Sequence, residues 1–517
     1  MRPQMLVCFP AYKKVFGVFW CLPVLSAFSF LLLLAGCGGG ASSFVHTSPT
    51  PTSQWKWGWV DGNNTVGAQY TGPAGVYGTL DIAAANNIPG GRSGSANWID
   101  SSGNLWLFGG IGYDAAGTPG DLNDLWEFDP VNKEWTWVSG DNSVGAAFGS
   151  QPGVYGTLGI PSASNVPSGR ENAAHWIDNN VNLWLFGGLH FPSVTTQGQG
   201  LNDLWEFNPT TKEWTWVSGS NTNIGGGGPS GVYGTLDVAA ASNVPGGRSD
   251  STSWIDSSGN YWLFGGYGND STGGSGFLND LWEFNPTSKE WTWVSGSNTV
   301  TAGAWGRPGT YGALDTASSS SIPGGRSDGA GWIDSSGNLW LFGGNGVDSA
   351  GVLGALNDLW EFNPTTKEWT WMSGSNTAGA NGIGQPGVYG TKGIAAASNI
   401  PGGRSGSLNW VDGSNTLWLL GGVGNDSAGK GGGVLNDLWE FNTTTKEWTW
   451  ISGSSTAGES GVYGTRGGAP AANYIPGGRY DSAGWIDSSG TLWLFGGDGI
   501  DSHGVSGSLD DLWHFQP

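Results

Sequence analysis

Six arginines that could bind an acidic ligand recur through this 517-residue sequence. Each follows a Pro-Gly-Gly or Pro-Ser-Gly step, and they are Arg92, Arg170, Arg248, Arg326, Arg404 and Arg479. A guanidinium group can hold a carboxylate through two parallel hydrogen bonds, so a ring of such cations would suit a carboxylate or sialic-acid-like ligand. The same arginines could instead hold neighbouring structural units together. The sequence leaves both roles open.

A second candidate site is the pair Trp305 and Arg307, which the other copies of the repeat do not share. An aromatic ring beside a cation suits a sugar or an acidic group. We therefore predict ligand contacts here, with local packing of the surrounding linker as the alternative.

Tyrosines and aspartates also repeat. The tyrosines lie in GVYGT or TYGAL segments and could stack on sugar rings or anchor the linker through their hydroxyl groups; they are Tyr77, Tyr155, Tyr233, Tyr311, Tyr389 and Tyr463. The aspartate of each NDLW segment is expected to hold a turn. Glycine-rich loops carry one further carboxylate each, whereas calcium prefers six to eight oxygen ligands. We predict no metal site and no cofactor.

These residues belong to one repeated unit, exemplified by residues 254–296, WIDSSGNYWLFGGYGNDSTGGSGFLNDLWEFNPTSKEWTWVSG. Its Gly-Gly doublet recurs every 78 residues, and after 75 at the last step, at Gly109, Gly187, Gly265, Gly343, Gly421 and Gly496. We expect four strands in each unit: strand a ends in WID, b is LWLFGG, c is NDLWEF and d is WTWV. Strand b is apolar on both faces, which indicates burial from both sides.

Four-stranded sheets packed on both faces by like neighbours are the blades of a β-propeller. The segment Trp57-Gly58-Trp59-Val60 matches strand d, and the last unit stops after a strand c at Phe515. We therefore predict an all-β fold, a six-bladed β-propeller over residues 55–517, closed by the N-terminal strand pairing into the last blade. The b–c loops and d-to-a linkers, including GVYGT, should share one face, the loop face. The short a–b and c–d turns should occupy the opposite turn face.

The units resemble kelch repeats, which carry an Arg before strand a, a Gly-Gly doublet after strand b and spaced aromatics such as Trp126 and Trp135. The resemblance covers about residues 55–517, although the period exceeds the roughly 50 residues of ordinary kelch units. It implies that the arginines have a structural part between blades. Galactose oxidase also has kelch blades, but its copper chemistry needs a Tyr–Cys crosslink, and these repeats contain no Cys. Kelch-type sugar epimerases, which use six blades without a metal, are the catalytic alternative that the resemblance implies.

The N-terminus predicts export. A basic segment and an apolar run precede Leu34-Ala35-Gly36-Cys37, which resembles the lipobox of bacterial lipoproteins. We predict a signal peptide over 1–36, lipidation of Cys37 and a flexible tether over 37–54, placing the protein in a bacterial cell envelope. A signal-anchor helix is the alternative.

The net charge of −22 argues against nucleic acid and anionic membrane surfaces as partners, so we expect membrane contact only through the lipid. The loop sets are nearly alike, whereas an active site brings unlike groups together. We therefore predict a non-catalytic binding or scaffold module that presents its loop face to a glycan or an exported protein. The alternative is a carbohydrate-directed enzyme such as a sugar epimerase.

Overall fold

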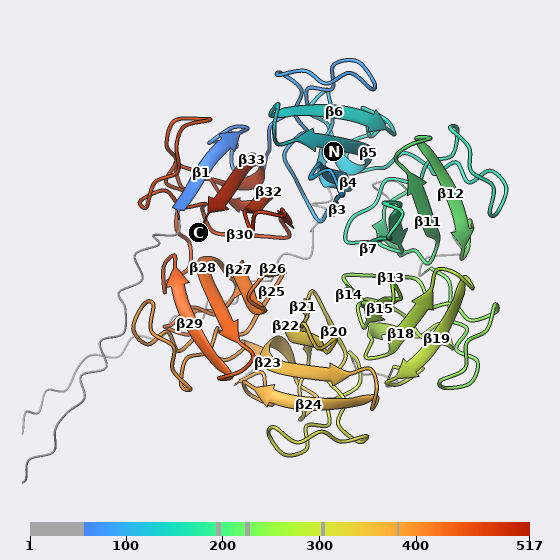
Figure 1. Cartoon of the computed structure of the whole chain (residues 1–517), viewed down its shortest axis with the longest axis vertical. Coiled ribbons are helices and arrows are strands. Elements are labelled where there is room, and N and C mark those ends of the chain that lie inside the picture. The colour runs from blue at the N-terminus through green and yellow to red at the C-terminus, as the bar shows by residue number, and fades with distance from the viewer. Residues whose placement is uncertain (1–55, 193–197, 223–227, 301–304, 380–381, 517) are drawn as a thin grey trace, which may run out of the picture. The chain divides into compact units, whose positions relative to one another are not determined.

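The computed structural model describes residues 56–516 except 193–197, 223–227, 301–304 and 380–381. These residues form six blades around a central axis, with strand a innermost and strand d outermost in each blade (Figure 1). Cys37 and the predicted leader and tether lie outside the described residues, so the predicted domain bounds stay predictions. Among the residues that the structure describes, no helix is long and apolar enough to cross a bilayer.

The strands of the first three blades follow the predicted order a, b, c, d. Blade 1 contains β2 (Arg92–Ser93), β3 (Ala96–Ile99), β4 (Leu105–Tyr113), β5 (Pro119–Asp129) and β6 (Glu134–Ser139). Blade 2 contains β7 (Ala174–Ile177), β8 (Leu183–Phe186), β9 (Leu189–His190), β10 (Gln199–Gly200), β11 (Leu204–Asn208) and β12 (Glu213–Ser218). Blade 3 contains β13 (Arg248–Ser249), β14 (Thr252–Ile255), β15 (Tyr261–Phe264), β16 (Tyr267–Asn269), β17 (Ser275–Phe277), β18 (Leu281–Asn285) and β19 (Glu290–Ser295).

The remaining blades repeat the pattern, and the last takes its outer strand from the N-terminal part of the described chain. Blade 4 contains β20 (Arg326–Ser327), β21 (Ala330–Ile333), β22 (Leu339–Val347), β23 (Leu353–Asn363) and β24 (Glu368–Ser373). Blade 5 contains β25 (Arg404–Ser405), β26 (Leu408–Val411), β27 (Thr416–Gly424), β28 (Gly433–Asn442) and β29 (Glu447–Ser452). Blade 6 contains β30 (Arg479–Tyr480), β31 (Ala483–Ile486), β32 (Leu492–Ile500), β33 (Ser506–Gln516) and β1 (Lys56–Asp61).

The hydrophobic cores lie between blades rather than inside them. In β4 the LWLF run is buried on both faces, as its apolar pattern predicts. Each of six hydrophobic clusters combines side chains of two neighbouring blades. One of them joins Trp126 and Trp135 of blade 1 to Trp485 and Trp493 of blade 6. Every blade therefore depends on both of its neighbours.

Strand β1 closes the ring by pairing antiparallel with β33, with Trp57 opposite Phe515 and Trp59 opposite Trp513. The Trp57 side chain is 2% exposed, and its ring centroid lies 4.7 Å from that of Phe515. The predicted six-bladed fold and its closure are confirmed.

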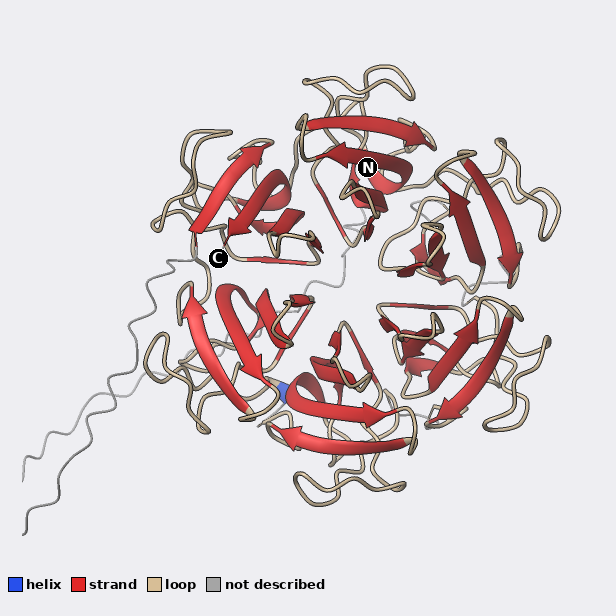
Figure 2. Ribbon diagram, in the orientation of Figure 1, coloured by secondary structure: helices blue, strands red, loops and turns tan. Residues whose placement is uncertain are grey.

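The placement of the GVYGT linkers differs from the prediction. They form loops outside the outer strands (Figure 2) rather than lying on the loop face. In blade 1 the linker folds back on itself through a Val76–Ile88 bridge, and Ala84 pairs with Trp135 of β6. The outer strand would otherwise leave its backbone groups unpaired, so the residues beyond an ordinary kelch period protect a sheet edge.

A closed ring of backbone hydrogen bonds surrounds the axis. The residue two positions after each arginine donates its N–H to the equivalent carbonyl of the preceding blade, at 2.7–3.2 Å; these residues, the axial ring, are Gly94, Asn172, Asp250, Asp328, Gly406 and Asp481. All six have φ between 51° and 66°, which explains the choice of Gly, Asn and Asp. The ring joins blade 1 to blade 6 a second time, near the axis.

Replacing Trp57 with Ala should destabilise the protein by about 3–5 kcal/mol, because it removes a fully packed aromatic side chain from the closing strand. Deleting residues 55–61 should expose the β33 edge and abolish cooperative melting. Urea denaturation and calorimetry measure both effects, and Lys56→Ala is the control because Lys56 is exposed in the same strand. An unchanged melting profile in the deletion variant would contradict this closure.

Candidate functional site

The repeated arginines lie in a buried network rather than at a ligand surface. In blade 1, Arg92 donates from Nη1 and Nη2 to the two Asp124 carboxylate oxygens at 2.7 and 2.8 Å, and from Nη1 to the Gly109 carbonyl at 3.1 Å. The same carboxylate accepts hydrogen bonds from the Tyr77 hydroxyl at 2.6 Å and from Trp126 Nε1 at 2.7 Å. This cluster therefore ties the start of strand a, strand c and the linker to one another.

All six blades contain this cluster. Its ion pairs are Arg92–Asp124, Arg170–Asp203, Arg248–Asp280, Arg326–Asp358, Arg404–Asp437 and Arg479–Asp511. Each arginine side chain is at most 2% exposed. The predicted ring of cations at the channel mouth is therefore not formed, because every guanidinium group is buried against its own blade's aspartate. The anchoring role of the tyrosines is confirmed in every blade.

Electrostatics fix the charge of this cluster. Burial alone would raise the pKa of Asp203, but Arg170 and the hydrogen bonds from Trp205 and Tyr155 bring it below its ordinary value. Burial, followed by the charge of Asp124, raises the pKa of Tyr77 well above its ordinary value. The blade 2 cluster thus holds an ionised Arg170–Asp203 pair, and the Tyr77 hydroxyl of the blade 1 cluster stays neutral.

The structure separates Trp305 and Arg307. Arg307 donates from Nε and Nη2 to the carbonyl and hydroxyl of Thr299, at 2.9 and 2.8 Å. Gln385 makes the equivalent contacts with Thr377, so Arg307 tethers a linker turn in the way that Gln does in another blade. Arg307 lines a groove of about 690 Å³, and Trp305 lies outside it, 61% exposed. These contacts favour local linker packing for Arg307 and leave Trp305 as a surface aromatic.

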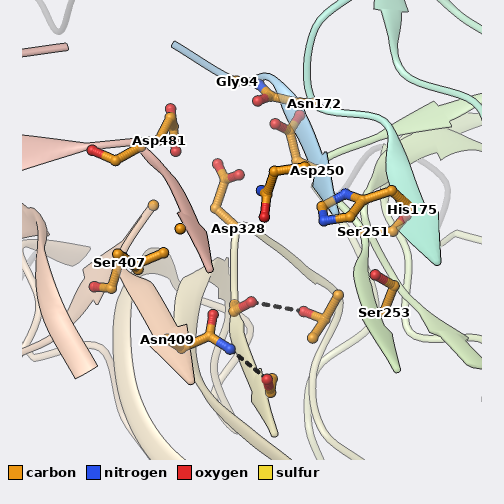
Figure 3. Close-up of a pocket in the computed structure, with 18 of the residues that line it drawn as sticks. Gly94, Asn172, His175, Asp250, Ser251, Ser253, Asp328, Ser407, Asn409 and Asp481 are labelled. Atoms are coloured by element: carbon orange, nitrogen blue, oxygen red, sulfur yellow. Dashed lines mark hydrogen bonds between the residues drawn. The ribbon is translucent and has the colours of Figure 1, made fainter. Parts of the chain in front are cut away.

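A polar cavity of about 250 Å³ lies on the axis and is lined by the strands a of all six blades. Asp250, Asp328 and Asp481 of the axial ring contribute to its wall, with His175 and Asn409 further along strand a (Figure 3). Burial lowers the pKa of His175 to about 4, so its imidazole is neutral at physiological pH.

Three more carboxylates lie close to the axial ring, where the repeat departs from symmetry. Glu171 replaces the serine that follows the arginine in four blades, Asp498 follows the last Gly-Gly doublet, and Asp121 lies in β5. We call these three residues the acidic mouth. Tyr480 occupies the position of Glu171 in blade 6, and its hydroxyl faces the Asp498 carboxylate at 3.4 Å. This group was not predicted from the sequence, although each exchange is visible when the six copies are compared position by position.

The acidic mouth and the axial ring carry unusual pKa values. Burial raises the pKa of Asp121 to about 7, and burial with the charges of Asp250 and Asp498 raises that of Asp481 to about 7. Burial and neighbouring carboxylates hold the pKa values of Glu171 and Asp328 well above their ordinary range. No lysine or arginine of the described chain forms a salt bridge with any of these six side chains.

His190 and Ser150 lie together but do not form a nucleophilic pair. His190 Nδ1 lies 2.7 Å from the Gly169 carbonyl and 2.9 Å from Ser150 Oγ, and Ser150 Oγ donates to the Phe191 carbonyl. Because a carbonyl only accepts, Nδ1 carries the proton and cannot take one from Ser150. This contact is therefore structural.

The glycine-rich loop aspartates hold their own loops. Asp114 Oδ1 accepts the N–H groups of Ala116 and Thr118, and its Oδ2 accepts the Val144 N–H of the adjoining linker. Asp270, Asp348, Asp426 and Asp501 repeat this pattern. Within the described ranges, no three His, Cys, Asp or Glu side chains are arranged to hold a metal ion.

Replacing Asp358 with Asn should cost about 3–5 kcal/mol of unfolding free energy, because it leaves the Arg326 charge buried without its counter-charge. Tyr311→Phe, which removes one hydrogen bond to the same carboxylate, should cost about 1–2 kcal/mol. Urea titration measures both. Lys367→Ala is the matched control, since it breaks an exposed ion pair with Asp237 and should cost less than about 1 kcal/mol. A loss below about 1 kcal/mol in Asp358→Asn would contradict the structural role of the cluster.

Stability should fall as pH rises from about 4 to about 7 and level off above. Asp481 and Asp121 have folded-state pKa values of about 7, whereas an unfolded aspartate titrates near 4. Between these values the folded protein keeps protons that the unfolded chain releases, so deprotonation favours unfolding. In Asp481→Asn and in Asp121→Asn, the unfolding free energy should fall less between about pH 4 and about pH 7, by at least about 1 kcal/mol in each variant. Urea denaturation across this pH range measures the difference. Glu134→Gln, on the turn face, is the control, and variants with an unaltered pH profile would argue against these shifts.

Comparisons with known proteins add little to this geometry. No family model matches the chain, and no curated protein matches it. Among solved structures, one titled "Structure of YjhT" aligns with 83% of this chain and 99% of that chain, at 15% identity and a TM-score of 0.44. The propeller assignment therefore rests on the blade topology of this chain itself.

Proposed function

We propose that this protein is a non-catalytic binding module that presents its loop face to an exported protein or a glycan. The observation that carries the proposal is the difference between the polar side chains that recur in every blade and those that occur in only one blade. The repeated Arg, Asp and Tyr side chains are buried and bonded to one another, so they are not offered to a ligand. The unrepeated carboxylates collect around one end of the axis.

Exposed aromatic side chains on the loop face support binding. Trp305 is 61% exposed and Tyr70 is 76% exposed, whereas most tryptophans of the blades are buried. Aromatic side chains at a protein surface supply large contact areas for both proteins and sugars. A rigid propeller that displays variable loops is a common arrangement for recognition.

We also propose that the chain is a kelch-type propeller anchored to a bacterial envelope through a lipid on Cys37. The Arg, Gly-Gly and aromatic positions support the family, and the Leu-Ala-Gly-Cys segment supports the anchor. Cys37→Ser should abolish incorporation of labelled fatty acid and stall or release the precursor. Mass spectrometry that finds residues 1–36 on the mature protein would favour a signal-anchor helix instead.

A carbohydrate-directed enzyme, such as a sugar epimerase, is a second candidate because of one observation. Asp481 lines the axial cavity, and Asp121 lies near Glu171 in the acidic mouth. Both have pKa values of about 7, and general acid–base catalysis works best with groups that titrate near the working pH. Turnover of a sugar that is lost in Asp121→Asn or Asp481→Asn would support this candidate over simple binding.

A binding screen against envelope proteins and a glycan array tests the proposed function. We expect a ligand whose affinity falls about tenfold or more in Trp305→Ala, because this change removes the largest exposed side chain of the loop face. Val131→Ala is the control, since Val131 is 88% exposed on the turn face. A ligand that binds equally well to Trp305→Ala would remove Trp305 from the site, and the absence of any loop-face ligand would contradict the proposal.

A further inference from the structure

Exposed apolar side chains lie in linker turns of the loop face, and two of them, Tyr70 and Phe148, lie in turns that contact strands of the acidic mouth. Tyr70, Phe148, Trp305 and Ile383, which we call the crown, are 76%, 45%, 61% and 51% exposed. They lie in linker turns that border the beginning of strand c. The Tyr70 N–H donates to the Ser506 carbonyl at 2.7 Å, and the Trp305 carbonyl accepts the Phe277 N–H at 2.7 Å.

Backbone contacts connect the crown to the acidic mouth. The Asp121 N–H donates to the carbonyl of Gly149, the neighbour of Phe148, at 3.0 Å. On the other side, the Ser508 N–H donates to the carbonyl of Thr71, the neighbour of Tyr70, and Ser508 Oγ donates to Asp498 at 2.7 Å. The turns that carry Phe148 and Tyr70 therefore adjoin residues of the acidic mouth in blades 1 and 6.

The acidic mouth lacks a counter-charge of its own. Within the described ranges, the Glu171 carboxylate has no cation and no hydrogen-bond donor, and the side chain is half-buried. The six repeated arginines are paired inside their blades, and five lysines lie in c–d turns on the opposite face, namely Lys133, Lys212, Lys289, Lys367 and Lys446. In the described turns of the loop face, Arg307 is hydrogen-bonded to Thr299. Lys430 lies in blade 5, which contributes no residue to the acidic mouth.

We propose that the loop face docks a basic polypeptide segment, with a Lys or Arg side chain in the acidic mouth and apolar side chains against the crown. This inference rests on the proposed function and names the class of partner. Without a counter-charge these carboxylates retain protons at neutral pH, and a bound cation would supply that counter-charge and favour their ionised form, which a neutral glycan cannot do. A small polyamine would supply the charge but leave the apolar crown exposed. The chain's net charge of −22 would also speed the encounter with a basic partner.

The test measures binding of defined probes to the full-length protein by calorimetry at low and high salt. The probes are a short peptide of alternating Lys and Leu, the same peptide with Glu in place of Lys, spermine, and a neutral chito-oligosaccharide. The Lys-Leu peptide should bind at least about tenfold more tightly than the others and weaken as salt rises. Its affinity should fall about tenfold in Glu171→Gln or Asp498→Asn, and similarly in Tyr70→Ala.

The control variants are Glu134→Gln and Val131→Ala on the turn face, which should bind like the parent protein. Glu171→Gln and Asp498→Asn relieve repulsion between carboxylates, so a loss of binding in them does not reflect unfolding; melting temperatures verify this. Spermine binding as tightly as the peptide, without dependence on the crown, would overturn the docking surface. So would peptide binding that the acidic-mouth variants leave unchanged. If only the neutral oligosaccharide bound, and its binding depended on the crown, this inference would be wrong while the proposed function would still stand.

Discussion

The structure depends on strands that are apolar on both faces. Each LWLF strand must be covered twice, and each hydrophobic cluster joins two neighbouring blades, so no blade has a core of its own. An open row of such blades would leave two apolar faces in water. Closing the row into a ring removes both faces, and strand β1 and the axial ring of hydrogen bonds each join the first blade to the last. The long linkers solve the remaining problem, the exposed outer edge of every blade.

Buried ion pairs organise the polar part of this core. An Arg–Asp pair out of water gains little net stability, because desolvation offsets most of the attraction. Here each pair also receives hydrogen bonds from a Tyr, a Trp and the Gly-Gly turn, so it connects three segments that are distant in sequence. The repeated chemistry of the chain thus serves architecture. The unrepeated side chains, Glu171, Asp121 and Asp498, lie near the axis, where we propose that recognition takes place.

The fold could be predicted because strand length and apolar pattern can be read within one repeat. The closing strand could be predicted by counting strands, since the first segment matches a strand d and the last unit lacks one. The same reasoning could not place the arginines. Arg92 and Asp124 repeat in step along the sequence, but only the pairing of β2, β4 and β5 brings their side chains together. The position of the GVYGT linkers was predicted wrongly for a related reason. The linker in blade 1 runs along the outer edge of β6 because it pairs with the backbone groups there, and this pairing is visible only in the folded structure. The acidic mouth was missed because single exchanges, such as Glu171 beside Arg170 or Asp498 in β32, are small signals whose effect arises when blades 1, 2 and 6 meet.

The central claim is that carboxylates meeting near the axis remain partly protonated at neutral pH and form the functional centre of the molecule. The most direct measurement is carbon-detected NMR titration of Asp and Glu side chains in the folded protein, assigned with Asp481→Asn, Asp121→Asn and Glu171→Gln. The account predicts that the Asp481 and Asp121 resonances titrate near pH 7 and that Glu171 titrates well above its ordinary range. Titration of all three groups near pH 4, as in an exposed carboxyl, would contradict it.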